Sequence, residues 1–252
     1  MKAIDLFAGA GGFSEGARQA GLDVVWAANH WKLACDVHEA NHGIKPKCQD
    51  LHQADWTQVP AHDIMLASPS CKGHSKARGK DRPHHDAQRA TAWAVVSAAE
   101  CHRPRAIVVE NVPEMAEWVL FPAWCSALEA LGYTLSAEIL CASRFQVPQF
   151  RERLFIVAAR KRFVFPPVPT TDAVPIRTVL DLDGGEWLPW EASKRIAMGV
   201  APFEPKPMAR ILAGRKRHGD RPFWVPYFGP TSMGGALTSL SGPSPRTTAT
   251  GS

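Results

Sequence analysis

The stretch "DLFAGAGGFSEG", from Asp5 to Gly16, determines how the first part of the chain is read. An apolar run, "KAIDLF" (2–7), overlaps its start, and a helical pattern that stops at Gly21 follows it. This order is typical of a buried strand, a glycine-rich turn and a helix. Glycines at positions 9, 11 and 12 would let the backbone approach a ligand closely, beside the free amides of a helix N-terminus. The spacing is G-x-G-G and not the dinucleotide G-x-G-x-x-G, so the turn favours another nucleotide-type cofactor, or only a tight turn.

The same alternation of strands and helices continues along the chain to about residue 163. Apolar, β-branched runs predict strands, and apolar residues spaced three or four apart predict helices. We therefore expect an α/β fold with a doubly wound, mostly parallel sheet over residues 1–163. The expected strands are 2–7, 23–29, 47–50, 63–68, 105–112, 134–142 and 153–160, and the expected helices after the first are 31–41, 86–102 and 121–132.

A second, smaller region is expected over residues 164–252. The proline-rich run "FPPVPTTDAVP" marks the boundary or an extended connector, and glycine and proline remain dense from residue 184 onward. A basic run, "ARILAGRKRHGDRP", lies within this loop-rich region. It reads either as a surface that binds a polyanion or as an ordinary solvated loop.

Composition sets the limits for these interpretations. The chain has 252 residues, a formal net charge of +5 and a pI near 9.0, which permit a polyanionic partner without requiring one. No apolar run approaches the roughly 20 residues that span a bilayer, and the N-terminus does not resemble a signal peptide. The six cysteines form no C-x-x-C pair. Reduced thiols, a cytoplasmic location and no membrane association are therefore expected.

A metal site deserves separate consideration because Cys35, His38, His42, Cys48 and His52 have the side chains that zinc prefers. Their spacings fit no common zinc finger, and "ACDVHEANHG" reads as an ordinary helix and its exit. We therefore predict no metal.

Chemically active side chains stand near the ends of the expected strands. Cys71 follows "DIMLAS", Glu110 and Asn111 end "AIVVEN", and "QVPQFRER" with Arg153 leads into "LFIVAA". Ligands of open α/β sheets bind beyond the carboxyl ends of the strands, so Cys71 and Glu110 are expected to converge there. A carboxylate at the end of a buried strand needs a partner, which singles out Glu110, although structural capping would also explain it.

Taken together, these motifs resemble those of the DNA cytosine-5 methyltransferases. "DLFAGAGGFSEG" is similar to the family's motif for S-adenosylmethionine, "SPSCKGHS" to its Pro-Cys-Gln nucleophile loop, "VVENVP" to its Glu-Asn-Val motif and "QVPQFRERLFIVA" to its Gln-x-Arg-x-Arg motif. Near the end, "GPSPRTTAT" resembles the motif that follows the target-recognition region. The motifs occur in the family's order over nearly the whole chain. The resemblance implies a class I methyltransferase fold, Rossmann-like, with a small loop-rich target-recognition region at the C-terminus.

The resemblance also implies the catalytic roles. Cys71 would add as a thiolate to carbon 6 of a cytosine flipped out of double-stranded DNA, and so activate carbon 5 for methyl transfer. Glu110 would hold a proton against ring nitrogen 3, and Arg153 would bind the cytosine carbonyl oxygen. Arg151 and Asn111 would hold the nucleophile loop.

Further positions follow from the same resemblance. The turn after the first strand would hold the methionine part of S-adenosylmethionine, and residues after the next strands would hold the nucleoside. Basic and polar residues would contact DNA. The implied cofactor-binding residues are Phe7, Ala8, Gly9, Gly11, Gly12, Asn29, His30, Asp50, Leu51 and Pro69, with Trp93 as a further candidate for the pocket wall or the core. The implied DNA-binding residues are Lys72, Ser75, Gln149, Arg215, Lys216 and Arg217.

Three departures from the family pattern leave alternatives open. Ser70 and Lys72 flank Cys71 where the family has Pro and Gln, and the lysine cation should favour the thiolate. Asn29 stands where the family carries an acid, which points either to ordinary S-adenosylmethionine or to a modified cofactor. The family's final segment is missing, so either the chain is truncated, or a second polypeptide supplies the segment, or this chain is not an active enzyme by itself. Besides a bacterial or phage DNA methyltransferase of a restriction-modification system, a transfer-RNA cytosine-5 methyltransferase and a non-catalytic, partner-dependent DNA-binding subunit remain alternatives.

Overall fold

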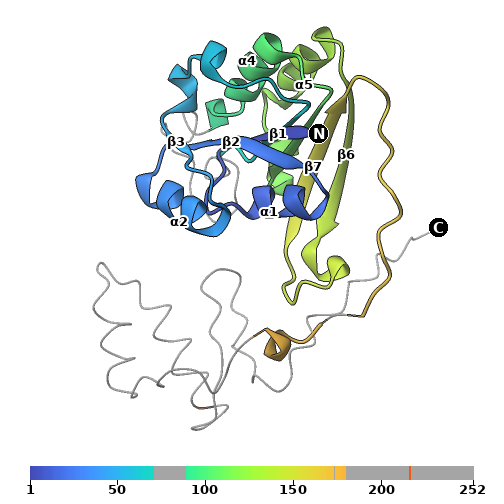
Figure 1. Ribbon diagram of the computed structural model, residues 1–252. Helices are drawn as coiled ribbons and strands as arrows, with labels where there is room; N and C mark the ends of the chain where they lie inside the picture. The colour runs from blue at the N-terminus through green and yellow to red at the C-terminus, as the bar shows by residue number, and fades with distance from the viewer. Residues whose placement is uncertain (71–88, 173, 180–215, 217–252) are drawn as a thin grey trace, which may run out of the picture. The chain divides into compact units, whose positions relative to one another are not determined.

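The computed structural model describes residues 1–70, 89–172, 174–179 and 216 (Figure 1). The chain divides into two compact units. The larger comprises Met1–Leu140 and Glu152–Val168, and the smaller comprises Cys141–Arg151 and Pro169–Ser252. Sequence analysis expects the boundary after residue 163, close to the end of the larger unit.

The larger unit is built on one sheet to which all seven described strands belong, in the order β3-β2-β1-β4-β5-β7-β6. Strands β1 to β5 pair in parallel, and β7 runs antiparallel to β5. The order reverses direction on either side of β1, which is the doubly wound arrangement expected from the sequence. The strands are β1 (Lys2–Leu6), β2 (Asp23–Asn29), β3 (Lys47–Cys48), β4 (Ile64–Ala67), β5 (Ala106–Asn111), β6 (Thr134–Cys141) and β7 (Glu152–Ala159).

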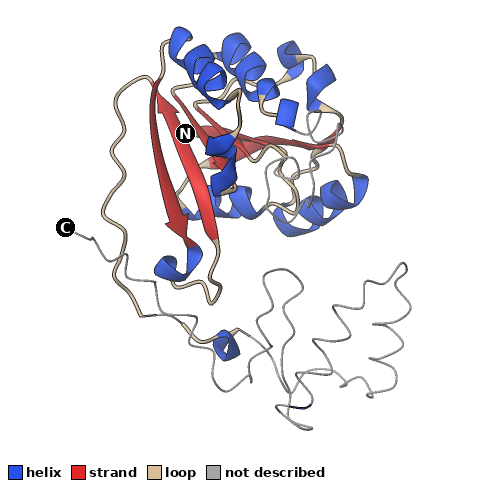
Figure 2. Ribbon diagram, turned by 180° about the vertical axis from the view of Figure 1, so that it is seen from behind, coloured by secondary structure: helices blue, strands red, loops and turns tan. Residues whose placement is uncertain are grey.

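Helices cover both faces of this sheet. Helices α1 and α2 lie on one face, and α4 and α5 lie on the other (Figures 1 and 2). The helices are α1 (Gly12–Gln19), α2 (Lys32–His42), α4 (Trp93–His102) and α5 (Phe121–Ala130), and short 3₁₀ turns include η1 (Leu51–Gln53), η2 (Trp56–Gln58) and η4 (Pro113–Glu117). None of the helices within the described residues is long and apolar enough to cross a membrane.

The alternation of β1 explains how the two faces are filled. Ile4 and Leu6 are fully buried in the main hydrophobic cluster, together with residues of α4 and α5, whereas Ala3 packs in a smaller cluster with Ala17 of α1. Successive side chains of a strand point to opposite faces, so one apolar strand serves both layers. Asp5 shares the α1 face and is also fully buried.

The main cluster depends on small residues in α4 and on one large residue in α5. Ala98 and Ala99 of α4 are fully buried, and small side chains let the helix approach closely. Trp124 fills the space beside them with no exposed surface, and its indole N–H donates to the Ala92 carbonyl at 2.9 Å. Burial of a ring of this size contributes strongly to the core, and its one polar atom is satisfied.

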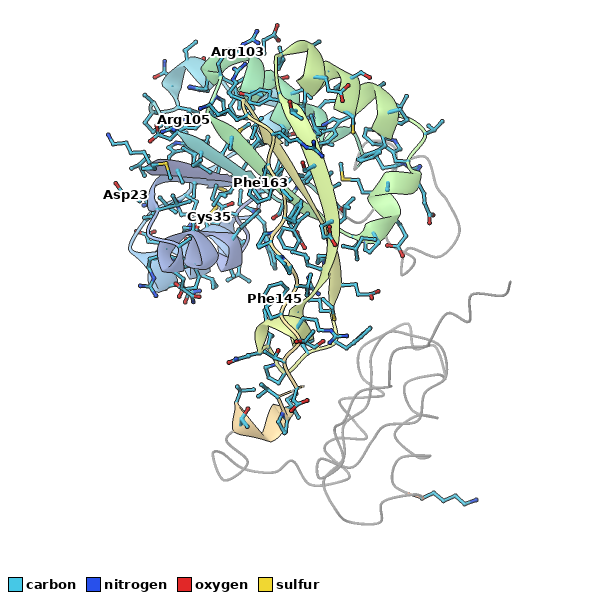
Figure 3. All side chains as sticks on the ribbon, turned by 90° about the vertical axis from the view of Figure 1, so that its right-hand side faces the viewer. Asp23, Cys35, Arg103, Arg105, Phe145 and Phe163 are labelled. Carbon is cyan, nitrogen blue, oxygen red and sulfur yellow. The ribbon has the colours of Figure 1, made fainter. Side chains whose placement is uncertain are left out.

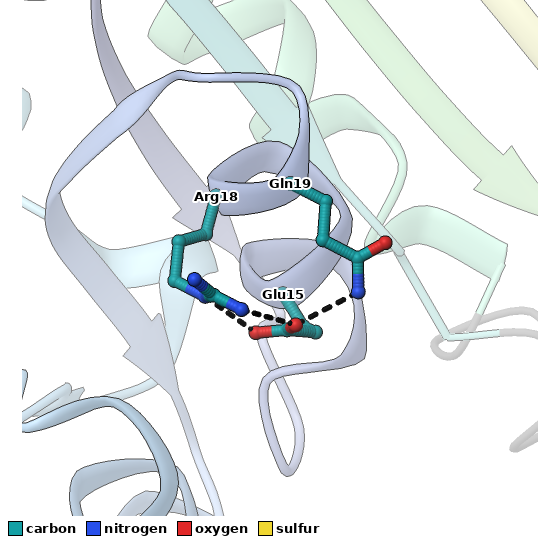
Figure 4. A network of polar contacts seen from close by, with 3 residues as sticks. All are labelled: Glu15, Arg18 and Gln19. Atoms are coloured by element: carbon teal, nitrogen blue, oxygen red, sulfur yellow. Dashed lines mark hydrogen bonds and ion pairs between the residues drawn. The ribbon is translucent and has the colours of Figure 1, made fainter.

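Helix α1 is short and is stabilised by contacts along its exposed side. Glu15 accepts hydrogen bonds from Arg18 and Gln19, three and four residues on, at 2.8–2.9 Å (Figure 4). These partners lower the pKa of Glu15 to about 2, with Arg18 the larger cause. The helix follows Gly11, whose positive φ of 94° suits a glycine.

Only parts of the smaller unit are described. They include the turns η5 (Ala142–Phe145) and η6 (Ile176–Thr178), and Phe145 is labelled in Figure 3. The Thr171 hydroxyl donates to the Arg144 carbonyl at 3.0 Å and ties the two parts of this unit together. Most of the expected target-recognition region lies outside the described residues.

Candidate active site

The candidate site lies at the carboxyl edge of the parallel strands. Asp23 and Arg105, labelled in Figure 3, mark the opposite edge, because they stand at the amino ends of β2 and β5. The loops that follow β1, β2, β3, β4 and β5 therefore gather at one edge of the sheet. Sequence analysis expects the cofactor-binding residues and Cys71, Glu110 and Asn111 at these strand ends or in the loops that follow them.

The glycine-rich turn after β1 is tightly folded. Phe7, Gly9 and Gly11 have positive φ values of 62°, 56° and 94°. The Ala8 amide donates to the Ala28 carbonyl of β2 at 3.0 Å, and the Gly11 amide donates to the Ala8 carbonyl at 2.9 Å. The turn is thus held in a strained, specific shape that directs the chain into α1.

Open space lies beside this turn. A Cβ atom added at Gly9 or Gly12 would meet no atom of the described residues within 4 Å. A Cβ at Gly11 would instead lie 2.2 Å from His42 Nε2. The backbone at Gly9 and Gly12 is therefore open to approach, whereas Gly11 is required for packing against α2. Such a cradle fits a small cofactor at the start of α1.

The ends of β2 and β3 carry the next candidates. The Asn29 side chain is 8% exposed, and its Oδ1 accepts a hydrogen bond from the Trp31 amide at 2.9 Å, so it shapes the turn into α2. His30 is exposed. The exposed Asp50 carboxylate accepts from the His52 amide at 2.9 Å and caps η1, while Leu51 is 3% exposed within the core.

The loop after β4 leads to the candidate nucleophile. Pro69 is buried, and its carbonyl accepts a hydrogen bond from Asn111 Nδ2 at 3.1 Å. The Ser70 amide donates to the Thr91 hydroxyl at 3.0 Å. The chain is therefore anchored up to the residue before Cys71. Cys71, Lys72 and Ser75 themselves lie outside the described residues.

Glu110 and Arg153 form an ion pair at the ends of β5 and β7. Arg153 Nε lies 2.9 Å from Glu110 Oε1, and the two side chains are 21% and 24% exposed. The antiparallel register places Glu110 opposite Phe155, so Arg153 stands diagonally across from the carboxylate. The pair brings an acid and a cation, both still accessible, to the same edge as Asn111.

The remaining sequence candidates are not gathered at this edge by any described contact. Gln149 and Arg151 are exposed in the smaller unit, as is Lys216. Arg215 and Arg217 lie outside the described residues. Trp93 is half-buried against the core, with its ring centroid 6.4 Å from that of Trp118.

A buried polar network lies behind the glycine-rich turn. Ser14 Oγ is 2.6 Å from Asp5 Oδ2 and 3.1 Å from His38 Nε2, and His38 Nδ1 is 3.2 Å from the Ile44 carbonyl oxygen. Burial raises the pKa of Asp5 to about 7, and hydrogen bonding from Ser14 offsets this only in part. Burial also lowers the pKa of His38.

The residues considered and rejected as zinc ligands lie in different surroundings. His38 belongs to this network and His42 lies against its ring, Cys35 and Cys48 are neighbouring thiols, and His52 is exposed in η1. Among the described residues, no group of three or more His, Cys, Asp or Glu side chains is placed to hold a metal ion. Cys35 and Cys48 are free thiols. Burial raises the pKa of Cys35, and the neighbouring Cys48 thiol raises it further.

Several residues of this edge are not evident from the sequence. Asn41 of α2 donates to the Ala10 carbonyl in the glycine-rich turn at 3.0 Å, and Thr91 holds the Ser70 amide. Trp31, at the end of β2, exposes 59% of its surface. The signal in the sequence is a tryptophan two residues after a candidate cofactor strand, whereas its exposure is known only from the structure.

The sequence matches the family described as C-5 cytosine-specific DNA methylase over residues 1–179. The chain belongs to this family. The matched part includes all the described strands, the glycine-rich turn, Cys71 and the Glu110–Arg153 pair.

Relatives support this assignment. The chain is 32% identical over 186 residues to the type II methyltransferase M.NgoBI of Neisseria gonorrhoeae, covering 72% of this chain and 58% of the relative. It is 30% identical over 175 residues to M.HhaI of Haemophilus parahaemolyticus, covering 66% and 53%. The chain thus spans little more than half the length of these relatives.

Solved structures agree on the fold. The methyltransferase EhMeth of Entamoeba histolytica matches with a TM-score of 0.63 at 18% identity, covering 81% of this chain and 67% of that one. The Dnmt2 methyltransferase of S. pombe matches with a TM-score of 0.60 at 20% identity, covering 76% and 61%. These matches confirm the α/β, Rossmann-like fold expected from the sequence.

Proposed function

We propose that this methylase transfers a methyl group from S-adenosylmethionine to carbon 5 of a cytosine in DNA, through a covalent adduct on Cys71. The observation that carries the proposal is the shared anchoring at the ends of β4 and β5. Asn111 holds the Pro69 carbonyl, two residues before Cys71, and the neighbouring Glu110 pairs with Arg153. An acid, a cation and the base of the nucleophile loop thus share one edge of the sheet.

The cysteine supplies the nucleophile. Its thiolate adds to carbon 6 of the flipped cytosine, and the electron pair of the carbon 5–carbon 6 double bond shifts so that carbon 5 can attack an electrophilic methyl group. Methyl transfer breaks the bond between the methyl group and sulfur, so S-adenosylhomocysteine is the other product. A water molecule or another base then takes the carbon 5 proton, and departure of the Cys71 thiolate restores the carbon 5–carbon 6 double bond. Lys72 follows Cys71 in the sequence, and its cation favours the thiolate.

Glu110 and Arg153 stabilise the cytosine during this addition. Negative charge develops on the ring, and a proton held by Glu110 against nitrogen 3 neutralises it. The Arg153 guanidinium donates to the carbonyl oxygen at carbon 2. In the structure Glu110 and Arg153 pair with each other, so each charge has a partner in the absence of a ligand. When the base enters, both side chains can turn toward it.

The cofactor site fits the residues at the ends of β1 to β3. S-adenosylmethionine supplies an electrophilic methyl group on a sulfonium centre. The open backbone beside Gly9 and Gly12 admits its methionine part, and the amides at the start of α1 favour its carboxylate. The exposed Trp31 ring offers a face to a cation, and Asp50 offers a carboxylate to an amino group.

Phosphate contacts are assigned to the basic and polar residues named in the sequence analysis. A net charge of +5 supports binding to a polyanion. We assign Lys72 and Ser75, beside the nucleophile, to the flipped nucleotide. The exposed Gln149 and Lys216 are assigned to the flanking duplex, together with Arg215 and Arg217.

The experiment that tests this function is covalent trapping on DNA duplexes of random sequence that contain 5-fluorocytosine. Fluorine replaces the carbon 5 proton, so elimination is blocked and the protein stays attached to the DNA after methyl transfer. With S-adenosylmethionine present, we expect an adduct stable to denaturation. Cys71→Ser should abolish the adduct, whereas Cys101→Ser, which removes an exposed thiol on α4, should leave it intact.

An adduct that survives Cys71→Ser would overturn the assignment of the nucleophile. Absence of any adduct, with DNA binding intact, would favour a non-catalytic DNA-binding protein. Adduct formation on fluorinated transfer RNA but not on DNA would change the substrate class.

A further inference from the structure

The hydrogen bonds of the buried network behind the glycine-rich turn restrict where its protons can lie. Asp5, Ser14 and His38 come from β1, α1 and α2, and each has little or no exposed surface. The Ile44 carbonyl next to His38 Nδ1 can only accept, so a hydrogen bond there requires a proton on Nδ1. Ser14 has a single hydroxyl proton to share between Asp5 and His38.

Two arrangements satisfy all three contacts. In the first, Asp5 is ionised, Ser14 donates to it, and His38 must donate from both ring nitrogens as an imidazolium. In the second, the Asp5 carboxyl donates to Ser14, Ser14 donates to His38 Nε2, and a neutral His38 donates from Nδ1 to Ile44. Both arrangements hold the same number of protons. This number is one more than in a network of an ionised Asp5, a Ser14 hydroxyl and a neutral His38.

We infer that Asp5, Ser14 and His38 share this one proton, that it resides on Asp5, and that its loss loosens the glycine-rich turn and weakens cofactor binding. Without the proton, Ser14 donates to the Asp5 carboxylate and a neutral His38 can satisfy only one of its two contacts. Either the Ser14–His38 or the His38–Ile44 hydrogen bond must then break. The inference concerning affinity rests on the proposed cofactor site, whereas the proton arrangement does not.

Burial favours the arrangement with a protonated Asp5. Asp5 Oδ1 is fully buried and has no hydrogen-bond partner among the described residues. An unpaired carbonyl oxygen of a neutral carboxylic acid is far less costly to bury than an unpaired, charged oxygen of a carboxylate. The neighbours of Asp5 in the sheet register are Ala27 on β2 and Leu66 on β4, and neither carries a charge to stabilise an ionised form.

The charged and titratable groups around the network are few. The His42 ring lies beside the His38 ring, with centroids 4.8 Å apart and planes tilted by 51°, and its electrostatic effect helps to lower the pKa of His38. Glu15 of α1 interacts electrostatically with His42, and it is already paired with Arg18 and Gln19 (Figure 4). Lys45, which follows Ile44, is exposed.

The network is connected to the glycine-rich turn through one face of α2. Gly11 packs against both histidines, since a Cβ there would lie 2.2 Å from His42 Nε2 and 3.0 Å from His38 Cδ2. Asn41, between them on the helix, holds the Ala10 carbonyl at 3.0 Å. A shift of His38 is therefore transmitted to Ala10 and Gly11. Asp5, Ser14 and His38 thus act as positioning residues for the turn.

Cofactor binding should depend on pH through this proton. With the Asp5 pKa near 7, about one molecule in ten keeps the proton at pH 8, so the Kd for S-adenosylmethionine should rise from pH 6 to pH 8 by up to about tenfold, the value reached when only the protonated form binds. Asp5→Asn supplies a permanent donor to Ser14, so its Kd should change far less. Asp23→Asn removes an exposed carboxylate at the amino end of β2 and should behave as the unaltered chain.

The test combines isothermal titration with S-adenosylmethionine at pH 6, 7 and 8 and ¹⁵N NMR of the histidine side chains without cofactor. We expect the signals of His38 to show a neutral ring protonated on Nδ1 between pH 6 and pH 7. An imidazolium in this range, or the same change in Kd for the unaltered chain and Asp5→Asn, would overturn the inference. Ser14→Ala disconnects Asp5 from His38 and serves as a second variant, with the same loss of pH dependence expected.

Failure of the cofactor proposal would be distinguishable. If S-adenosylmethionine does not bind at any pH, the proposed function of this chain is wrong, and hydrogen exchange of the Ala8 and Gly11 amides, the hydrogen-bonded amides of the turn, still decides the network. Corrected for intrinsic rates, protection of these amides should fall above pH 7 in the unaltered chain and not in Asp5→Asn. Equal protection in both would contradict the shared proton.

Discussion

Substitution of Asp5 by Asn should stabilise the protein, and the gain should grow with pH. Asp5 has no exposed surface, and one of its oxygens has no partner within the described part of the chain. Burial raises its pKa from an ordinary 3.8 to about 7. Asparagine keeps the size of the side chain and can donate to Ser14, but it never carries the charge that burial penalises.

The sign and the magnitude follow from linkage between protonation and folding. Between pH 3.8 and about 7 the folded state binds more protons at Asp5 than the unfolded state, so the free energy of unfolding falls as pH rises. The contribution of Asp5 to the free energy of unfolding is fully present below pH 3.8 and is lost above about pH 7. Each unit of difference in pKa between the folded and unfolded states corresponds to 1.36 kcal/mol, so the full loss in the free energy of unfolding is about 4 kcal/mol. About 2.5 kcal/mol of this loss occurs between pH 5 and pH 8.

Urea unfolding followed by tryptophan fluorescence at pH 5 and pH 8 measures this effect. The difference in free energy of unfolding between Asp5→Asn and the unaltered chain should increase by about 2.5 kcal/mol over this range. Asp23→Asn, at an exposed position, is the matched control and should run parallel to the unaltered chain. If the free energy of unfolding of Asp5→Asn also changes with pH as that of the unaltered chain does, Asp5 is already ionised in the folded protein at pH 5. The reasoning from burial would then be wrong.

Three further substitutions test other parts of the structure. Gly11→Ala should lower the free energy of unfolding measured in urea by about 1–3 kcal/mol, because φ is 94° and the new Cβ would meet His42. It should also weaken S-adenosylmethionine binding in calorimetry, and an unchanged affinity would contradict the role of Gly11 in shaping the cofactor site. Trp124→Phe should cost about 1–3 kcal/mol in urea because the Ala92 carbonyl loses its donor and a cavity remains, and a loss under about 0.5 kcal/mol would refute it. Glu110→Gln should lower the rate of tritiated methyl transfer to DNA about 100-fold or more and leave the Kd for S-adenosylmethionine within about twofold, whereas an unchanged rate would remove Glu110 from catalysis.

The local structure is largely predictable from the sequence. The runs "DVVWAAN" and "AIVVEN" predict strands that the structure confirms at Asp23–Asn29 and Ala106–Asn111. The helix expected over 121–132 is observed as Phe121–Ala130. These elements depend on side-chain periodicity and on flanking glycine and proline residues, which are properties of neighbouring residues in the chain.

Pairings between distant residues are less predictable. The sequence indicates Glu110 as a carboxylate that needs a partner, but it offers several arginines. The antiparallel register of β5 and β7 selects Arg153. Likewise, nothing in the sequence near Ser70 indicates that Thr91 will hold its amide.

The alternation of strands and helices, the glycine-rich turn and the order of the family motifs can all be recognised in the sequence alone. The strand order β3-β2-β1-β4-β5-β7-β6, which brings the ends of β1, β4 and β5 together, is known only from the folded structure. Only the folded structure also shows that Asp5, which reads as an ordinary residue of a strand, is buried beside Ser14 and His38. The physical reason is that periodicity reports which face of an element is apolar, whereas the electrostatics of a buried group depend on side chains that packing brings from other elements.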